Sequence, residues 1–315
     1  MSKSDNGQTD YLQLLRPDAL GKISRLELIA RGVVEGFVTG RHRSPFKGFS
    51  VEFAEHRQYA PGDDLRDLDW RVYGKSDRYY IKQYIEETNL RCTILLDASG
   101  SMCYAGKQAA KIDGKAISKF EYARYLAASL AHLMIHQQDA TGLVTLDNRI
   151  RRYIPARSRA NHLRVILQQL QRTEPGSETA LAPILHNVAE RIHRRGLVIL
   201  ISDLFDDPEQ ILQALHHFRF KKHEVLVLHT MAEEELTFPF SANSLFEDLE
   251  LPERRIQLDP RAIRAEYLDR VRDFVETIRT GCGQMQVDYV PLSTGQDFAD
   301  GLSAYLANRR SRNKS

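Results

Sequence analysis

The sequence is poor in the residues that mark several large classes of protein. It holds only three cysteines, Cys92, Cys103 and Cys282. Three are too few for a disulfide framework, and so sparse a set is typical of a reducing compartment. No apolar segment is long enough to span a bilayer, and the polar N-terminus has no signal-peptide core. These absences predict a cytoplasmic protein without a membrane span.

A strong excess of one charge is also missing. The 44 Lys and Arg against 42 Asp and Glu give a net charge of +2, whereas a protein built to coat nucleic acid is usually more basic. One basic run is interrupted by Pro155 and has only Tyr153 to stack on a base, so we expect a solvated strand edge and no nucleic-acid partner. Its members are Arg149, Arg151, Arg152, Arg157 and Arg159. A phosphate-binding G-x-x-x-x-G-K-[ST] loop is absent as well.

The chain does have enough hydrophobic side chains for a sizeable core, since 42% of its 315 residues are hydrophobic. Composition divides it into a flexible tail over 1–16, an N-terminal region over 17–90, an α/β domain over 91–307 and a basic tail over 308–315. The N-terminal region begins with an amphipathic helical pattern that ends near Gly40. It continues, over residues 41–78, as a Gly-, Pro- and charge-rich segment that we expect to be irregular, followed by a strand.

From residue 91 onward, short apolar runs alternate with helical patterns. The runs do not alternate polar and apolar residues, which indicates strands buried on both faces of a mainly parallel sheet. Right-handed crossovers then give a doubly wound α/β domain. The expected strands are 91–97, 142–147, 150–155, 196–203, 223–230 and 285–292, and the expected helices begin at residues 120, 160, 181, 208, 260 and 297.

The sharpest chemical signal is the run Asp97-Ala98-Ser99-Gly100-Ser101, which stands where the first buried strand ends. Ligands of open α/β sheets bind at this edge. A carboxylate and two hydroxyls at alternate positions can point into one tight loop, and Gly100 lets the backbone turn there. Such oxygen ligands suit a hard cation, with magnesium the natural candidate. The alternative is a serine-rich turn in which Asp97 binds backbone amides.

Two further oxygen donors are expected at the same edge of the sheet, the rim formed by the carboxyl ends of its parallel strands. Thr179 lies in a loop before a helix, and Asp203 stands at the end of the expected strand 196–203, after its apolar run LVILI. The carboxyl ends of parallel strands share one edge, so donors from three loops would meet there, which favours the metal site.

These residues resemble the metal-ion-dependent adhesion site of von Willebrand factor type A domains. The resemblance covers LLDASGSM, the threonine of GSETAL and the ISD that ends at Asp203. It implies that Ser99, Ser101 and Thr179 are direct ligands of a weakly bound Mg²⁺ or another divalent cation. Asp97 and Asp203 would act from outside or through water, and one position would stay open for a carboxylate of a partner.

The segment GFSVEFAEHRQYAPGDDLRDLDWRVYGKSDRYYIKQY is similar to the bacterial family called domain of unknown function 58. That resemblance implies a type A-like, Rossmann-like domain with the N-terminal helix and irregular segment packed on it. It also implies a MoxR-type AAA+ ATPase as partner, in a chaperone-like or assembly role. A departure is the long polar stretch 103–118, which reads as an insertion beside the metal rim.

The charged block within this segment has two interpretations. It could form a second metal-binding or partner-binding surface, or a salt-bridged structural segment anchored by its tryptophan on the α/β domain. Mixed signs at close spacing favour mutual pairing and hence the structural role. The residues that would bind a partner are Asp64, Arg66, Asp69, Trp70 and Arg71.

Other reactive residues are less promising. His216 and His217 are neighbours on a predicted helix and so face different ways, which argues against joint metal binding. Cys92 should be a core residue of its strand, and Cys103 has no evident base beside it.

Three functions follow. A non-catalytic, magnesium-dependent protein-interaction module is favoured because no general base or nucleophile is evident. A metal-dependent phosphoesterase could use the same Asp, Ser and Thr residues, although the D-x-D pair of aspartyl-phosphate phosphatases is missing, since residue 99 is serine. A nucleic-acid binder is opposed by the low net charge.

Overall fold

The structure is a computed structural model. It describes residues 51–58, 69–76, 79–86, 91–112, 114–136, 138–176, 180–241, 244–250 and 253–296. The chain forms two compact units, one spanning 35–89 and the other made by the rest of the chain. The expected N-terminal helix, the helix expected from residue 297 and both tails lie outside the described residues.

The smaller unit is more regular than its sequence indicates. Val51–Gln58 forms strand β1, which pairs antiparallel with β2 (Tyr80–Glu86), and Trp70–Ser76 forms helix α2. The expectation of an irregular segment over 41–78 is therefore wrong for β1 and α2. The strand expected after residue 78 is confirmed as β2. The pairing shifts between Phe53 and Glu55, and such an irregularity breaks the two-residue period by which a strand is recognised.

The larger unit is built on a six-stranded sheet of order β12-β9-β8-β3-β6-β7. Neighbouring strands run parallel except at the edge, where β7 is antiparallel to β6. This confirms the mainly parallel, doubly wound α/β fold. The strands are β3 (Arg91–Asp97), β6 (Ala140–Leu146), β7 (Ile150–Arg157), β8 (Leu197–Ser202), β9 (Glu224–Met231) and β12 (Asp288–Ser293).

The direction in which the chain adds strands to the sheet reverses once. The chain begins in the sheet at β3 and winds outward through β6 to β7. It then returns to the other side of β3 with β8 and winds outward again through β9 to β12. The point between β3 and β8 is the topological switch point, where open α/β sheets bind ligands at the carboxyl ends of their strands.

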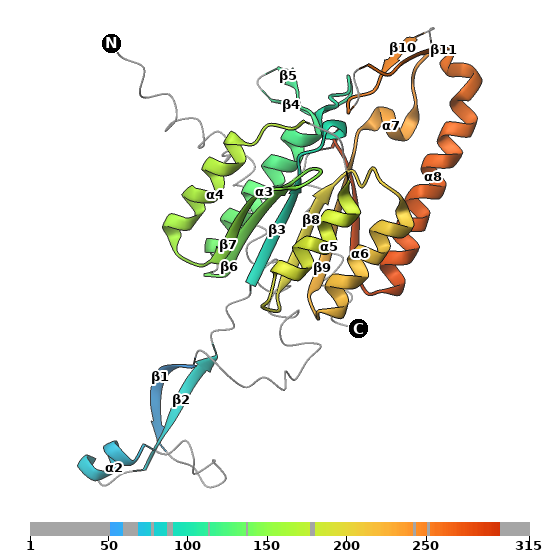
Figure 1. Ribbon diagram of the computed structural model, residues 1–315. Helices are drawn as coiled ribbons and strands as arrows, with labels where there is room; N and C mark the ends of the chain where they lie inside the picture. Colours follow the sequence, from blue (N-terminus) through green and yellow to red (C-terminus); the bar gives the residue numbers. More distant parts are fainter. Residues whose placement is uncertain are drawn as a thin grey trace, which may run out of the picture. The chain divides into compact units, whose positions relative to one another are not determined.

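Helices cover both faces of the sheet (Figure 1). On one face α5, α6 and the C-terminal part of α8 share a core with sheet residues such as Leu95, whereas α3 contacts β3, β6, β8 and β9 and packs beside α4. Successive strand residues point to opposite faces, so two covered faces explain the unbroken apolar runs. The helices are α3 (Lys119–His136), α4 (Ala160–Arg172), α5 (Leu181–Arg191), α6 (Pro208–Phe220) and α8 (Pro260–Gln284).

Several small elements gather beyond the carboxyl ends of the central strands (Figure 1). The small elements are the 3-10 turn η3 (Gly100–Cys103), the hairpin β4 (Lys111–Ile112) and β5 (Lys115–Ala116), helix α7 (Glu233–Thr237), and the hairpin β10 (Ser244–Glu247) and β11 (Arg255–Leu258).

None of the helices in the described part of the chain is long and apolar enough to cross a membrane.

Candidate functional site

Two aspartates stand at the switch point. Asp97 is the last residue of β3, and Asp203 directly follows β8. Strands β3 and β8 pair in register through Leu96 and Ile201, so their carboxyl ends lie side by side. The expectation that these two strand ends share one rim is confirmed.

The Asp97 loop brings three oxygen-bearing side chains together. Asp97 Oδ1 accepts a hydrogen bond from the Ser99 amide at 2.9 Å, and the Oγ atoms of Ser99 and Ser101 lie 3.1 Å apart. Asp97 and Ser99 are fully buried, and Ser101 is nearly so. The amide contact is the one expected of a simple turn, and the two hydroxyls add oxygen atoms of the kind that a hard cation prefers as ligands.

The donors around the Asp97 carboxylate are neutral. Besides the Ser99 amide, Ser202 Oγ donates to Asp97 Oδ2 at 2.5 Å. Burial, together with the nearby Asp203 carboxylate, raises the pKa of Asp97 to about 7, although these hydrogen bonds oppose the rise. Among the described residues, no cationic side chain hydrogen-bonds Asp97, so a bound cation would favour its ionised form.

Asp203 has a different environment, dominated by a lysine that the sequence analysis missed. The Lys119 ammonium lies 2.7 Å from Asp203 Oδ2 and 2.6 Å from Glu235 Oε1. Burial alone would raise the pKa of Asp203, but the ion pair with Lys119 holds that pKa below its ordinary value. Lys119 is 1% exposed, and a lysine this deeply buried requires such partners.

The residues after Asp203 present an aromatic ring to solvent. Leu204 is buried with a φ of 54°, in the left-handed region, and its amide bonds Ser202 Oγ at 2.8 Å. The Phe205 amide donates to Asp203 Oδ1 at 3.3 Å, and the Phe205 side chain is 69% exposed. Strained backbone of this kind persists where its surroundings hold it, often at functional sites. Here it places an apolar side chain beside the rim.

The third expected loop is described only at its flanks. Thr179 lies outside the described residues. Before it, the Gly176 amide donates to the Ala98 carbonyl at 3.1 Å, and after it, the Ala182 amide donates to Asp206 Oδ2 at 3.1 Å. The two flanks are thus fastened to the Asp97 loop and to the loop that follows Asp203.

A hairpin with no counterpart in the sequence predictions lies against the Asp97 loop. A Cβ atom on Gly100 would stand 2.8 Å from the Leu249 carbonyl oxygen and 3.2 Å from Glu250 Cγ. Gly100 is therefore needed not only for the turn but also for the close approach of the β10–β11 hairpin. The apolar residues of the β10–β11 hairpin are irregularly spaced, so the sequence did not predict its strands.

The polar stretch 103–118 does border the rim, as expected. It contains the short β4–β5 hairpin, and the Gln108 amide donates to Glu234 Oε1 at 2.8 Å. The Ala110 amide donates to the Thr294 carbonyl at 2.7 Å. The stretch is thereby attached to α7 and to the end of β12. Cys103 within it is exposed, but partial burial raises the pKa of its thiol, which makes it a poor nucleophile.

The charged block of the smaller unit is only partly visible. Asp64 and Arg66 lie outside the described residues, and Arg71 is described in its backbone alone. Asp69 is buried, and its Oδ1 accepts from the Val72 amide at 3.3 Å, which places it at the start of α2. Trp70 is 64% exposed. The Trp70 ring contacts the edge of the Tyr73 ring, with 6.2 Å between the ring centroids. That this tryptophan anchors the segment on the α/β domain stays a prediction.

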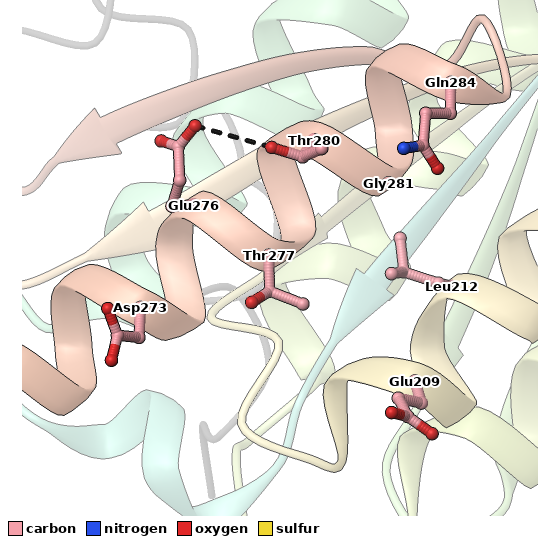
Figure 2. A pocket seen from close by; sticks show the side chains of 8 residues that line it. All are labelled: Glu209, Leu212, Asp273, Glu276, Thr277, Thr280, Gly281 and Gln284. Atoms are coloured by element: carbon pink, nitrogen blue, oxygen red, sulfur yellow. Dashed lines mark hydrogen bonds between the residues drawn. The ribbon is translucent and has the colours of Figure 1, made fainter.

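Other surface features lie away from the switch point. The arginines of the basic run are exposed on or beside edge strand β7, as expected. A shallow hollow of about 560 Å³ lies between α6 and α8 and is lined by three carboxylates that include Glu276. Figure 2 shows the side chains that line it. A Cβ on Gly281 would stand 2.5 Å from Leu212 Cδ1, so the Leu212 side chain would have to shift to admit it. No group of three or more His, Cys, Asp or Glu side chains within the described ranges is arranged to hold a metal.

Fold and site together define a doubly wound α/β protein with a buried oxygen cluster at its switch point. The chain belongs to the DUF58 family of proteins of unknown function, whose model matches residues 55–276. It is 25% identical over 302 residues to uncharacterized proteins of Mycobacterium tuberculosis and Mycobacterium bovis, with 93% of this chain and 90% of each relative covered.

Two solved structures overlap with the larger part of the chain. The conserved hypothetical protein BatB from Bacteroides thetaiotaomicron is 16% identical, with a TM-score of 0.46 and with 70% of this chain and 99% of that one covered. An aerotolerance-related membrane protein from Bacteroides fragilis is 15% identical, with a TM-score of 0.45 and coverage of 71% and 99%. Likenesses this distant carry no argument about function.

Proposed function

We propose that the protein is a non-catalytic, magnesium-dependent protein-interaction module. The observation that carries this proposal is the pair of buried hydroxyls, Ser99 and Ser101, beside Asp97 at the switch point. Neighbouring ligands of an octahedral Mg²⁺ with ~2.1 Å bonds are about 3 Å apart. The 3.1 Å between the two Oγ atoms fits that spacing.

The ligand set follows from the resemblance to the metal-ion-dependent adhesion site. Ser99, Ser101 and Thr179 would hold the cation, with Asp97 and Asp203 outside them. Lys119 already neutralises Asp203, so the ion would be held mainly by uncharged hydroxyls and would exchange readily. An ion bound in this way keeps charge available for an acidic side chain of another protein.

The partner that the family resemblance implies is a MoxR-type AAA+ ATPase in the cytoplasm, which would supply that acidic residue. Three features of the rim would add specificity: the exposed Phe205 ring, the 103–118 stretch and the β10–β11 hairpin. Loops on a rigid sheet are where binding specificity usually resides.

The non-catalytic character is supported by the groups beside the site. His229 is buried and already engaged, since Nε2 donates to the Asp203 carbonyl at 2.9 Å and Nδ1 lies 2.6 Å from the Tyr289 hydroxyl. Burial lowers the pKa of His229 to about 4, which makes it a weak base. A phosphoesterase would need a better placed base or nucleophile. Metal-dependent phosphatase turnover that Asp97→Ala abolishes would therefore replace this proposal.

The metal assignment is tested by calorimetric titration of the chelator-treated protein with Mg²⁺. Ser99→Ala/Ser101→Ala should abolish binding without unfolding the domain, because both ligating hydroxyls are lost while the backbone turn remains. The control is Ser129→Ala, which removes a buried hydroxyl from the middle of α3. Equal binding by the double variant and the control would exclude these ligands.

The interaction is tested by retention of a purified MoxR-type ATPase on the immobilised protein. We expect retention in Mg²⁺, release by chelator, and loss in Asp97→Ala, without a fall in thermal stability large enough to unfold the domain. A complex that survives both treatments would place the interface elsewhere, and Trp70→Ala would then test the smaller unit.

A further inference from the structure

Two histidines from neighbouring helices face each other on the larger unit. His186 of α5 and His217 of α6 are both half-buried, with their Nδ1 atoms 3.1 Å apart and their ring centroids 5.3 Å apart. His216, the other histidine of the pair in the sequence, is exposed on a different side of α6. The juxtaposition depends on packing between helices and involves a residue 31 positions away.

A carboxylate fixes the tautomer of His217. Glu190 Oε1 lies 2.9 Å from His217 Nε2, and Lys221 Nζ donates to Glu190 Oε2 at 2.6 Å. The hydrogen bond from Lys221 holds the pKa of Glu190 below its ordinary value, so Glu190 is an acceptor. In its neutral form His217 therefore donates through Nε2 and presents the lone pair of Nδ1 to His186. Carboxylates orient metal-binding histidines in this same way.

The two facing nitrogens cannot both present lone pairs with nothing between them. Either His186 Nδ1 carries a proton and donates it, or both nitrogens share a cation. Burial, with His217 nearby, lowers the pKa of His186, which favours the neutral ring that a metal ion requires. With ~2.05 Å bonds, a separation of 3.1 Å corresponds to an angle of about 98° at the metal, between square-planar and tetrahedral values.

We propose that His186 and His217 form a binding site for a zinc-like divalent ion, completed by water and oriented by Glu190. Imidazole nitrogens select zinc, copper or nickel, whereas the hydroxyl cluster at the switch point selects magnesium. The two sites are therefore independent. A bound ion would join α5, which follows the Thr179 loop, to α6, which follows the Asp203 loop.

The test is a calorimetric titration of the full chain with Zn²⁺ at pH 7.5 in a magnesium-containing buffer. We expect a single specific site in the wild-type protein that His186→Gln or His217→Gln weakens by at least ~10-fold, and that Glu190→Gln weakens by ~10-fold through loss of orientation. His216→Gln is the matched control, because it removes a neighbouring histidine from the same helix and should leave the affinity unchanged.

A second readout is thermal stability. Zinc should raise the melting temperature of the wild-type protein and of His216→Gln, because an ion that binds only the folded state stabilises it. It should not raise that of His186→Gln/His217→Gln, whose fold is verified by circular dichroism. Unchanged zinc affinity in that double variant, or an equal loss in His216→Gln, would overturn the proposal.

Discussion

The two aspartates at the switch point have nearly the same burial but opposite electrostatics. Asp97 is 0% exposed and Asp203 is 4% exposed. Asp97 is surrounded by amide and hydroxyl donors, and its pKa rises to about 7, whereas Asp203 bonds the Lys119 ammonium and its pKa falls. Burial alone therefore does not decide the charge of a carboxylate. One ammonium within hydrogen-bonding distance reverses the direction of the shift.

This difference divides the rim into two halves. The Asp97 half has carboxylate and hydroxyl oxygens but no cationic partner among the described residues, so it is the half that an added cation would complete. The Asp203 half already contains its cation, Lys119, which also links the rim to α7 through Glu235. Two predictions test this division, and a third provides a reference for pH dependence away from the rim.

The largest effect is expected when the internal cation is removed. Lys119→Met leaves the Asp203 carboxylate buried without its ammonium, which should lower the free energy of unfolding by ~3–5 kcal/mol. Urea denaturation followed by circular dichroism measures the loss. Lys119→Met/Asp203→Asn removes both charges of this ion pair and should recover the part of the loss that comes from Asp203, while Glu235 stays without its ammonium. If Lys119→Met alone is as stable as wild type, the ion pair does not hold this half together.

An intermediate effect is expected on magnesium affinity, which should depend on the Asp97 half. Asp97→Asn should weaken Mg²⁺ binding by ~10–100-fold, in the range known for groups that support metal ligands. The charge-balanced variant Lys119→Met/Asp203→Asn should stay within ~3-fold of wild type, because the ion sees no change in net charge. Calorimetry compares the two. An equal loss in both would show that Asp203 acts on the ion in spite of Lys119.

The smallest effect is expected on the pH dependence of the free energy of unfolding. It arises at the end of the sheet opposite the rim. His223 precedes β9, and its Nε2 bonds the Ile192 carbonyl at 3.3 Å. Burial lowers the pKa of His223, so on acidification the unfolded chain takes up a proton before the folded one. The free energy of unfolding should therefore fall as the pH drops below ~6.5.

His223→Gln should flatten that slope in urea titrations at successive pH values, carried out in chelator. His216→Gln, which removes an exposed histidine, should leave the slope unchanged. An unaltered slope in His223→Gln would mean that other groups carry the acid sensitivity.

The sequence by itself determined the secondary-structure plan of the larger unit and half of its site. Unbroken apolar runs identified the buried strands, since a strand covered on both faces has no polar side. The Asp97–Ser101 run is local in the chain, so its residues meet whatever the strand order is. The start of α6 is also fixed locally, since Asp207 accepts from the Gln210 amide and Pro208 stands in the first turn.

Only the tertiary structure decided what stands opposite that loop. The order that puts β8 beside β3 depends on the packing of whole crossovers, which no local pattern records. Lys119 meets Asp203 across 84 residues, and His217 meets His186 across 31. Such pairs form because burial leaves a charged or polar group no water to bind, so it must find a partner in the folded chain. Strand β1 was not predicted because its register shifts between Phe53 and Glu55. The pairing with β2 tolerates this irregularity, but the shift breaks the two-residue period by which a strand is recognised in a sequence.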